Sequence, residues 1–381
     1  MTLTNQKFIT VNSKCYPYHN DGGTCFTSYE IAKTADFIGY ESSVIIPRIF
    51  ERKKTEFYKK VEIKRYGYIS FYRDMKNLMQ SKNSIIYYNC AYNFHIILTL
   101  FAIVVNILLG KKTEAKVLFS GHGSFANSLS KKIYKTLWII LFIKPFLVLS
   151  KAKYVANAKG ELDDLCPQIK NLEIQFNVAE NRFPSFIFED EFSMSKYTKE
   201  YSHGQQHNNY ALYLGRIVKK KQLVETIEFL YLNHWFKNGF KLLVAHSNDD
   251  LNYLKDVKLK IKELALSKNV IFLGKISGHK KWDLILNAKA FILLSISEGL
   301  PMTLLEADTL GVPIVCTESC NYLPKTKNSI ILKELDEKVA ERLNTIKQST
   351  NSSFESVKKL NFDQIHLMNG FYLSFKEIFN E

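Results

Sequence analysis

The segment 297–307, SEGLPMTLLEA, carries two glutamates eight positions apart and is the strongest chemical signal in the sequence. Glu298 follows an apolar run expected to be a strand, and Glu306 lies on the helix expected next. Gly299 lets the backbone approach a ligand closely, and the start of a helix, here about Leu300 to Thr303 (with Pro301 and Met302 between them), offers free amides to an anion. A carboxylate one turn into that helix can accept hydrogen bonds from paired sugar hydroxyls. Two solvated glutamates are the alternative, which fits Glu306 poorly because its helical neighbours are apolar.

A basic turn, LGRIVKKK (214–221), ends another expected strand and leads into a helix. Ligands bind at the carboxyl ends of the strands in parallel sheets. Arg216 and Lys221 together can hold a diphosphate, one as a planar fork and the other as a point charge. Lys219 and Lys220 are better explained as a solvated basic turn.

Two further segments place glycines where a strand is expected to end. Gly22 and Gly23 follow Asp21 at the first strand-to-helix junction, a position that favours an anion. His122 lies between two glycines after the expected strand KVLFS, where it can bond a sugar hydroxyl or a phosphate. A plain turn and a loop histidine are the respective alternatives.

The elements that position these residues alternate between strand and helix in both halves of the chain. In the first half the expected strands and helices follow one another from Phe8 to about residue 156, and in the second half the alternation restarts at Tyr210. This order predicts α/β architecture with parallel sheets covered by helices on both faces. We predict a Rossmann-like domain over 1–183, a polar linker region over 184–209 and a second domain over 210–350. A last helix within 351–381 is expected to pack back toward the first domain.

Two apolar runs test whether the chain crosses a membrane. The run 94–109 has about 16 residues and contains His95 and Asn106, whereas a spanning helix needs roughly 20. We interpret it as a buried crossover helix. The run 137–149 is shorter and is interrupted by Lys144 and Pro145. The amino terminus lacks the pattern of a signal peptide, and six cysteines without metal-binding spacing indicate reduced thiols in a cytoplasmic protein.

The charge is concentrated in the first half. Residues 1–183 hold 26 Lys and Arg against 14 Asp and Glu, a net charge of +12 out of +15 for the chain. Nucleic acid, an anionic membrane surface or a polyphosphate ligand can each account for this excess, as can a generally basic proteome. The basic residues gather in 52–65, interleaved with Phe57, Tyr58 and Tyr66, and in 131–144, beside Trp138, Ile139, Ile140 and Phe142.

Together these segments resemble glycosyltransferase family 4, a family of retaining enzymes with the two-domain GT-B fold. EGLPMTLLEA is similar to its E-x7-E motif, LGRIVKKK to its strand-to-helix turn, DGGTCFTSYEIAK to its first glycine-rich loop, FSGHGSF to its histidine loop, and IQFNVAENRF to the element that leads out of its first domain. The resemblance spans nearly the whole chain and keeps the order and spacing of the motifs. It implies two Rossmann-like domains facing each other across a cleft.

The resemblance also implies roles for individual residues. Arg216 and Lys221 would bind the donor diphosphate, and Glu306 would hold the donor ribose. Glu298 and His122 would contact the transferred sugar. Gly22, Gly23 and the 299–303 segment would line the donor, and the backbone of Gly274 and Lys275 would flank the base. Three positions depart from the family pattern: Gln222 and Val178 stand where glycine is usual, and the segment 321–325 lacks a usual acidic residue.

The expected activity is therefore metal-independent, retaining transfer of a hexose from a UDP- or GDP-linked nucleotide sugar, without a cofactor. The expected acceptor is a glycan or a lipid-linked precursor of a polysaccharide such as capsule or lipopolysaccharide, met at the inner face of an anionic membrane. An epimerase of nucleotide sugars with the same fold is the first alternative. A basic nucleic-acid-binding protein ranks lower, because only 48–66 interleaves aromatic and basic residues, so no nucleic-acid partner is expected.

Overall fold

The chain divides into two compact units. The computed structural model describes residues 6–13, 23–48, 54–58, 61–89, 91–122, 124–125, 133–178, 209–247, 249–276, 279–298, 301–324, 326–336 and 338–348. The described residues of unit 1 lie within 6–178, and those of unit 2 within 209–348. The predicted linker region, apart from Asn209, and the predicted helix in 351–381 lie outside the described residues.

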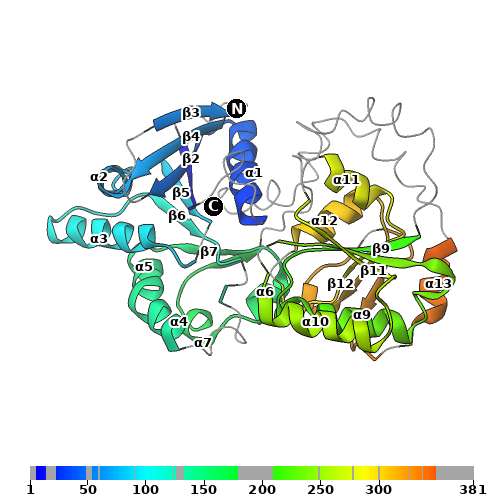
Figure 1. Ribbon diagram of the computed structural model, residues 1–381. Coiled ribbons are helices and arrows are strands. Elements are labelled where there is room, and N and C mark those ends of the chain that lie inside the picture. Colours follow the sequence, from blue (N-terminus) through cyan, green and yellow to red (C-terminus); the bar gives the residue numbers. More distant parts are fainter. Residues whose placement is uncertain are drawn as a thin grey trace. The chain divides into compact units, whose positions relative to one another are not determined.

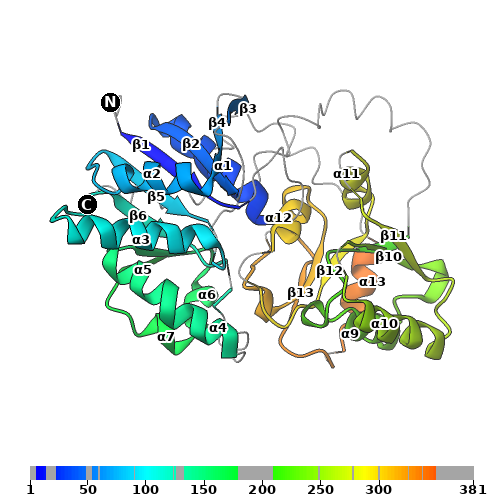
Figure 2. The ribbon, with the colours of Figure 1, turned by 60° about the vertical axis from the view of Figure 1, so that its left-hand side comes forward.

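Unit 1 is an eight-stranded sheet with helices on both faces (Figures 1 and 2). Its strands are β1 (Lys7–Val11), β2 (Glu41–Arg48), β3 (Lys54–Tyr58), β4 (Val61–Gly67), β5 (Ser84–Tyr88), β6 (Lys116–Phe119), β7 (Lys153–Ala156) and β8 (Phe176–Val178). Their order is β3-β4-β2-β1-β5-β6-β7-β8, and every pair is parallel except β3 with β4.

The helices of unit 1 form two layers because successive strand residues point to opposite faces of the sheet. The helices are α1 (Gly23–Ile38), α2 (Tyr68–Leu78), α3 (Phe94–Leu108), α4 (Ile133–Trp138), a π-helical turn η1 (Ile139–Ile143), α5 (Lys144–Leu149), α6 (Lys159–Asp163) and α7 (Pro167–Lys170). Phe8 of β1 packs in one cluster with Ile31 and Ala35 of α1. The next residue, Ile9, packs in the cluster that α2, α3 and α5 share on the other face.

Unit 2 is a six-stranded, wholly parallel sheet. Its strands are β9 (Tyr210–Leu214), β10 (Lys241–Ala245), β11 (Val270–Gly274), β12 (Ala290–Leu293), β13 (Ile314–Thr317) and β14 (Ile330–Leu332), in the order β11-β10-β9-β12-β13-β14. The helices α9 (Leu223–Leu232), α10 (Leu251–Glu263), α11 (His279–Leu286), α12 (Met302–Thr309) and α13 (Ala340–Gln348) alternate with the strands, and short 3-10 turns are η3 (Lys219–Lys221), η4 (Lys237–Gly239) and η5 (Glu318–Cys320). β12 and β13 are fully buried, as strands of a doubly covered parallel sheet must be.

Two expectations for unit 1 need correction. The β3–β4 hairpin and α2 were not predicted from the sequence, because the dense charge of this segment hides the alternation. In β4, Val61 and Ile63 are buried while Glu62 and Lys64 are partly exposed. The run 94–109 does form a crossover helix, α3, but it is buried only on its inner side, and Phe101 and Leu108 on its outer side are 57% and 79% exposed.

The second apolar run is helical throughout 133–149. It passes through Pro145, which lacks an amide donor, and the i→i+5 turn η1 directly precedes that helix segment. Within the described residues, none of the helices combines the length and apolar character required to cross a membrane. Cys166, Cys316 and Cys320 are free and buried.

Candidate functional site

The strand order of unit 2 creates a topological switch point between β9 and β12. The chain proceeds from β9 outward to β10 and β11, then returns to the other side of β9 for β12. The loops after these two strands therefore diverge, and open α/β sheets bind ligands at this switch point. Lys221, from the turn after β9, forms a 2.9 Å ion pair with Glu298, from the loop after β12. The two motifs found 77 residues apart in the sequence thus meet at one point.

Glu298 is held from several directions. Its Oε1 also accepts a hydrogen bond from Ser295 Oγ at 2.9 Å. Its backbone amide donates to Ser319 O, and its backbone carbonyl accepts from Asn321 Nδ2 at 2.6 Å. Burial would raise the pKa of Glu298, but the charges of Lys221 and Lys220 outweigh it and hold that pKa below its ordinary value. Glu298 is therefore a fixed carboxylate.

The turn after β9 presents Arg216 to solvent on a braced backbone. The carbonyl of Arg216 accepts a hydrogen bond from Tyr213 Oη, and the amide of Ile217 donates to Asp249 Oδ1 at 2.8 Å. Asp249 is itself paired with His246. The Asp249–Asp250 pair thus has structural contacts, because Asp250 caps the start of α10. The exposed guanidinium of Arg216 stands on a fixed turn and is available to an anion.

Gln222 stands where the family usually has glycine, and its backbone conformation shows how the turn accommodates it. Gln222 adopts φ +48° and ψ +49°, the left-handed conformation, between η3 and α9. This is the conformation that glycine adopts most readily, so the backbone keeps the turn even though the residue differs. Lys221 packs closely against Gly215, where an added Cβ would lie 3.2 Å from its Cδ.

Glu306 lies on α12 and is 2% exposed. Lys281 Nζ, from α11, contacts its Oε1 at 2.7 Å, while Oε2 is buried and has no hydrogen-bond partner among the described residues. Burial raises the pKa of Glu306, and Lys281 opposes that rise. Lys281 also lies 4.5 Å from the ring centroid of Trp282. Sequence reasoning missed Lys281, because nothing in the polar stretch 278–283 distinguishes it from a solvated lysine.

The remaining predicted residues of unit 2 lie at neighbouring strand and helix ends. α12 begins at Met302, so the amides of Met302 and Thr303 precede its first internal bond, which Leu304 donates to Pro301 O. Gly274 ends β11 with φ +69°, and its carbonyl accepts from the His246 amide. The exposed Lys275 follows it. Gly299 and Leu300 lie outside the described residues.

Unit 1 has an amide-rich network at its own switch point, between β1 and β5. Asn12 follows β1 and Asn89 follows β5, and the side-chain amides of both donate to Ser28 Oγ of α1 at 2.7 Å. Asn89 also donates to Thr27 Oγ1. Sequence reasoning did not identify these asparagines, although each directly follows an apolar strand. Gly23 begins α1, and Gly22 lies outside the described residues.

His122 joins this network through both ring nitrogens. Its Nε2 contacts Asn89 Oδ1, and its Nδ1 lies 2.9 Å from Asn157 Nδ2, after β7. Because Asn157 Nδ2 is a donor, Nδ1 accepts and Nε2 carries the proton. Burial lowers the pKa of His122 to about 4, so the ring is neutral at pH 7. The predicted sugar contact therefore requires the ring to exchange one of these two bonds.

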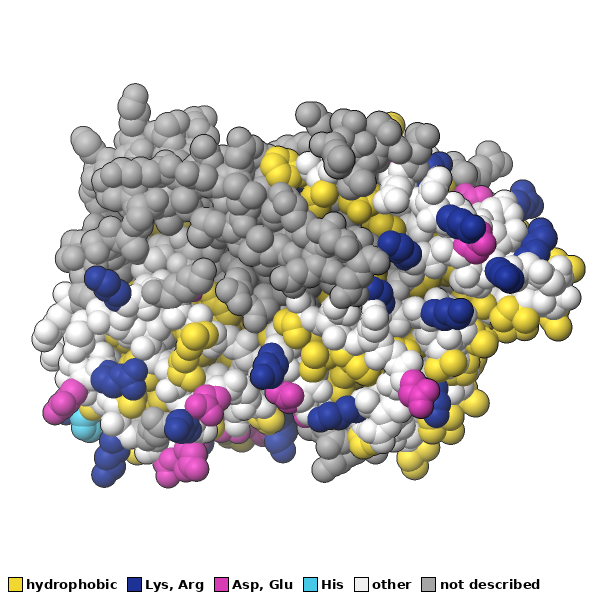
Figure 3. Space-filling model, turned by 180° about the vertical axis from the view of Figure 1, so that it is seen from behind, with side chains coloured by type: hydrophobic (Ala, Val, Ile, Leu, Met, Phe, Trp, Pro, Cys, Tyr) yellow, Lys and Arg dark blue, Asp and Glu magenta, His cyan; other side chains and the backbone are white. Residues whose placement is uncertain are grey.

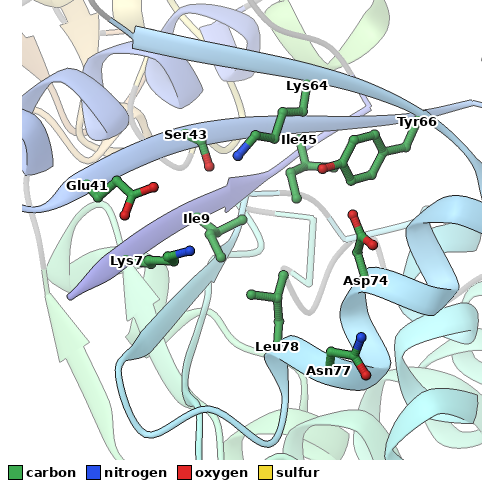
Figure 4. A pocket seen from close by; sticks show the side chains of 10 residues that line it. All are labelled: Lys7, Ile9, Glu41, Ser43, Ile45, Lys64, Tyr66, Asp74, Asn77 and Leu78. Carbon is green, nitrogen blue, oxygen red and sulfur yellow. The ribbon is translucent and has the colours of Figure 1, made fainter. Parts of the chain in front are cut away.

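A separate cavity of about 270 Å³ lies on one face of β1, β2 and β4, beside α2 (Figure 4). It is lined at the first residues of β1 and β2 by Lys7 and Glu41, and by Lys64 and Asp74 from β4 and α2. Asn77 and Leu78 of α2 also line it, so the cavity lies between this helix and the sheet. None of the predicted site residues lines it.

The family-model match lies within unit 2. Residues 198–349 match the model of the family described as glycosyl transferases group 1. A segment of 111 residues is 31% identical to TuaC of Bacillus subtilis (strain 168), named as a glycosyltransferase of teichuronic acid biosynthesis. That alignment covers 28% of this chain and 24% of TuaC, so the chain matches about a quarter of the length of this curated relative.

Solved structures match over almost the whole chain. The α,α-trehalose-phosphate synthase (UDP-forming) of Burkholderia xenovorans has a TM-score of 0.62 at 11% identity, with 98% of this chain and 99% of that chain covered. The sucrose-phosphate synthase of Thermosynechococcus elongatus has a TM-score of 0.64 at 13% identity, with the same coverage of both chains. The fold is GT-B, and the family match supports a group 1 glycosyltransferase.

Proposed function

We propose that the protein is a retaining glycosyltransferase that moves a hexose from a UDP- or GDP-linked donor onto an acceptor. The observation that carries this proposal is the Lys221–Glu298 pair at the switch point of unit 2, beside the exposed Arg216. The group 1 family match over the same unit supports it. The similar Burkholderia synthase is described as UDP-forming, which favours a UDP-linked donor here.

In the proposed complex Arg216 and Lys221 neutralise the donor diphosphate. The diphosphate takes over the ammonium of Lys221, which Glu298 holds in the free protein, and Glu298 then accepts a hydrogen bond from a hydroxyl of the transferred sugar. The Glu298 carboxylate and the backbone of the turn that carries Arg216 are held in place before the donor arrives, which limits the reorganisation needed when negative charge develops on the departing nucleoside diphosphate. The amides of Met302 and Thr303, at the start of α12, are further hydrogen-bond donors for the diphosphate.

The buried carboxylate of Glu306 is proposed to accept hydrogen bonds from the donor ribose. Its Oε2 is desolvated and has no partner among the described residues, and a buried acceptor in this state gains most from a hydroxyl donor. Gly274 and Lys275 would flank the base through their backbone. In this proposal retention follows a front-face displacement in which the leaving phosphate takes the acceptor's proton, and no metal is needed because the two cations serve in its place.

The acceptor is proposed to be a glycan or a lipid-linked polysaccharide precursor, met by unit 1 at an anionic membrane surface. Two observations support this: the net charge of +12 in residues 1–183 and the similarity to a protein of teichuronic acid biosynthesis. The asparagine–histidine network after β1, β5 and β7 supplies amide and imidazole groups suited to sugar hydroxyls.

The test combines donor binding with two variants. UDP, GDP and ADP and their sugars are screened by thermal shift, since a ligand at 100 times its Kd stabilises a protein by about 2.7 kcal/mol. Arg216→Ala and Glu306→Ala should each lower kcat/KM by roughly thirtyfold or more, because losing one partner of a desolvated charged contact costs about 2–5 kcal/mol. Leu259→Ala, at a 65% exposed side chain of α10, is the control. Near-normal turnover by either variant overturns the assignment, and conversion of the donor without acceptor indicates an epimerase.

A further inference from the structure

The outer surface of α3 and of the α4–η1–α5 segment is apolar to an unusual degree. Leu108 and Ile133 are each 79% exposed, although both are aliphatic. Other large apolar side chains more than a third exposed on these elements are Phe94, Phe101, Val104, Ile107, Tyr134, Leu137, Ile140, Leu141, Val148 and Leu149. Together with Leu108 and Ile133 they are named here the α3–α5 face. Exposed apolar patches of this kind mark binding surfaces.

These residues belong to one surface because α3 packs beside η1 and α5. The inner sides of the same helices hold Ile96, Ile103, Ile139 and Phe146 in a shared core cluster. The outer side chains therefore cannot turn inward, since the core is already filled. In Figure 3 hydrophobic side chains gather at the side of unit 1 where α3 and α5 lie, with basic residues among them.

Acidic residues are scarce in the segment that forms the α3–α5 face. Glu114 is the only acidic residue between Phe94 and Gly160 in the sequence, and it lies 3.7 Å from Lys82. Lys144 and Lys151 are exposed beside the apolar residues. A surface that combines aliphatic side chains with exposed lysines is complementary to an anionic lipid surface.

The other predicted basic cluster is different. In the β3–β4 hairpin Lys54 and Arg65 pair with Glu56, and Lys64 pairs with Glu62. Tyr66, expected to be an interfacial aromatic, is 3% exposed. Arg52, Lys53, Lys59 and Lys60 lie outside the described residues. The described basic residues of this hairpin are largely neutralised by glutamates of the same strands.

We propose that the α3–α5 face inserts into the boundary between headgroups and acyl chains of an anionic membrane. Aliphatic side chains enter the apolar region, and Lys144 and Lys151 remain at the level of the lipid phosphates. This inference rests on the proposed function only in one respect: insertion would bring unit 1 to a lipid-linked acceptor. Membrane binding itself does not depend on catalysis.

Flotation of the full chain with vesicles of equal parts phosphatidylglycerol and phosphatidylcholine tests the proposal. Leu108→Glu combined with Leu141→Glu should lower the ratio of vesicle-bound to free protein at least about tenfold. Each change removes an aliphatic side chain that the membrane would otherwise bury. The matched control is Leu251→Glu combined with Leu259→Glu, at 72% and 65% exposed positions of unit 2, which should float like the wild type. Donor thermal shifts of both variants should equal that of the wild type.

Depth of insertion gives a second readout. Native Trp138 lies on α4, so each variant is compared with the wild type. Ile133→Trp should show a larger shift to shorter wavelength with anionic vesicles and more quenching by brominated acyl chains than the wild type, whereas Leu251→Trp should add no quenching beyond that of the wild type. Equal flotation of the Leu108/Leu141 variant and the wild type overturns the proposal, as does a wild-type dimer that the same variant converts to monomer. Glu306→Ala should still bind vesicles; if it transfers sugar normally, the proposed function fails while the insertion stands.

Discussion

Lys281 and Glu306 form a 2.7 Å ion pair between α11 and α12, and the other carboxylate oxygen of Glu306 is buried without a hydrogen-bond partner in the part of the chain that the structure describes. The lysine has no donor-binding role of its own in the proposed mechanism. Its effect is on Glu306, whose pKa burial raises and Lys281 pulls back. In the proposed mechanism Lys281 is therefore a positioning residue that favours the ionised form of the carboxylate proposed to bind the donor ribose.

Replacing Lys281 by methionine should weaken donor binding through Glu306. Without Lys281 the pKa of Glu306 should rise further. The ionised carboxylate is the better hydrogen-bond acceptor. As the pH is lowered, the variant should therefore lose donor affinity at a higher pH than the wild type does. At neutral pH the expected loss is about tenfold or more, because hydrogen bonds to charged groups contribute roughly 1.5–3 kcal/mol. Calorimetric Kd values across pH measure it. Lys281→Arg should restore most of the affinity, and a pH profile identical to the wild type would falsify the positioning role.

The Lys221–Glu298 pair should stabilise unit 2 in a pH-dependent way. Glu298→Gln leaves Lys221 without its counter-charge and should lower the free energy of unfolding by roughly 3 kcal/mol at neutral pH. Since the folded pKa of Glu298 is below its ordinary value, the stabilisation is complete above that ordinary pKa and is lost as pH falls through the folded pKa. The difference between wild type and variant should shrink accordingly in urea titrations. Glu263→Gln, which breaks an exposed pair with Lys260, should change nothing measurable.

Gln222 is held in a conformation that is unfavourable for its residue type. A left-handed non-glycine residue costs about 1–2 kcal/mol, so Gln222→Gly should raise the free energy of unfolding by about 0.5–1 kcal/mol after its entropic penalty. Gln222→Val should lower it, because a β-branched residue is poorly tolerated there. Glycine at Glu228, inside α9, should destabilise instead by about 1 kcal/mol. Destabilisation by Gln222→Gly in thermal unfolding contradicts this account of the turn.

His122 should titrate far below an ordinary histidine. Its pKa of about 4 follows from burial, so its ring signals should show a midpoint near that pH in an NMR titration. Long-range nitrogen–proton spectra should show the Nε2–H tautomer at pH 7, as the bonds to Asn89 and Asn157 require. Asn157→Ala should relax this preference. A His122 midpoint near 6.5 in the wild type would mean that the network is open in solution.

Transfer should proceed without divalent metal and with retained anomeric configuration. The proposed roles of Arg216 and Lys221 motivate this, since two cations suffice to stabilise the leaving diphosphate. Initial rates should be unchanged by EDTA, and proton NMR of the first product should show the donor's anomeric configuration. Activity abolished by EDTA and restored by manganese contradicts the first expectation, and an inverted product contradicts the second.

The sequence predicted unit 2 well because its strands are uninterrupted apolar runs. The apolar runs of β12 (AFIL) and β13 (IVCT) are typical of buried strands, and the residues that follow such strands lie at one edge of the sheet. Glu298 and Lys221 could therefore be predicted to lie near each other, and they do. Lys281 could not, because a lysine that pairs with a buried carboxylate has no local pattern that separates it from a solvated one.

Unit 1 was harder to predict for two physical reasons. The β3–β4 hairpin is an edge feature whose strands carry charge on the partly exposed face, so its alternation is weak. The exposure of the α3–α5 face depends on which elements pack against each helix, and amino-acid composition does not predict those neighbours. The apolar run 94–109 correctly predicted a helix but not that Leu108 would face solvent.

The strand order of unit 2 also has a consequence for biosynthesis. β9 pairs with β10 on one side, but its partner on the other side, β12, is translated some eighty residues later. Until then one edge of the central strand lacks its native partner, and an unpaired apolar edge invites association with other chains. A nascent chain stopped before β12 should therefore be prone to aggregation, whereas one stopped after β14 has every strand of this sheet available.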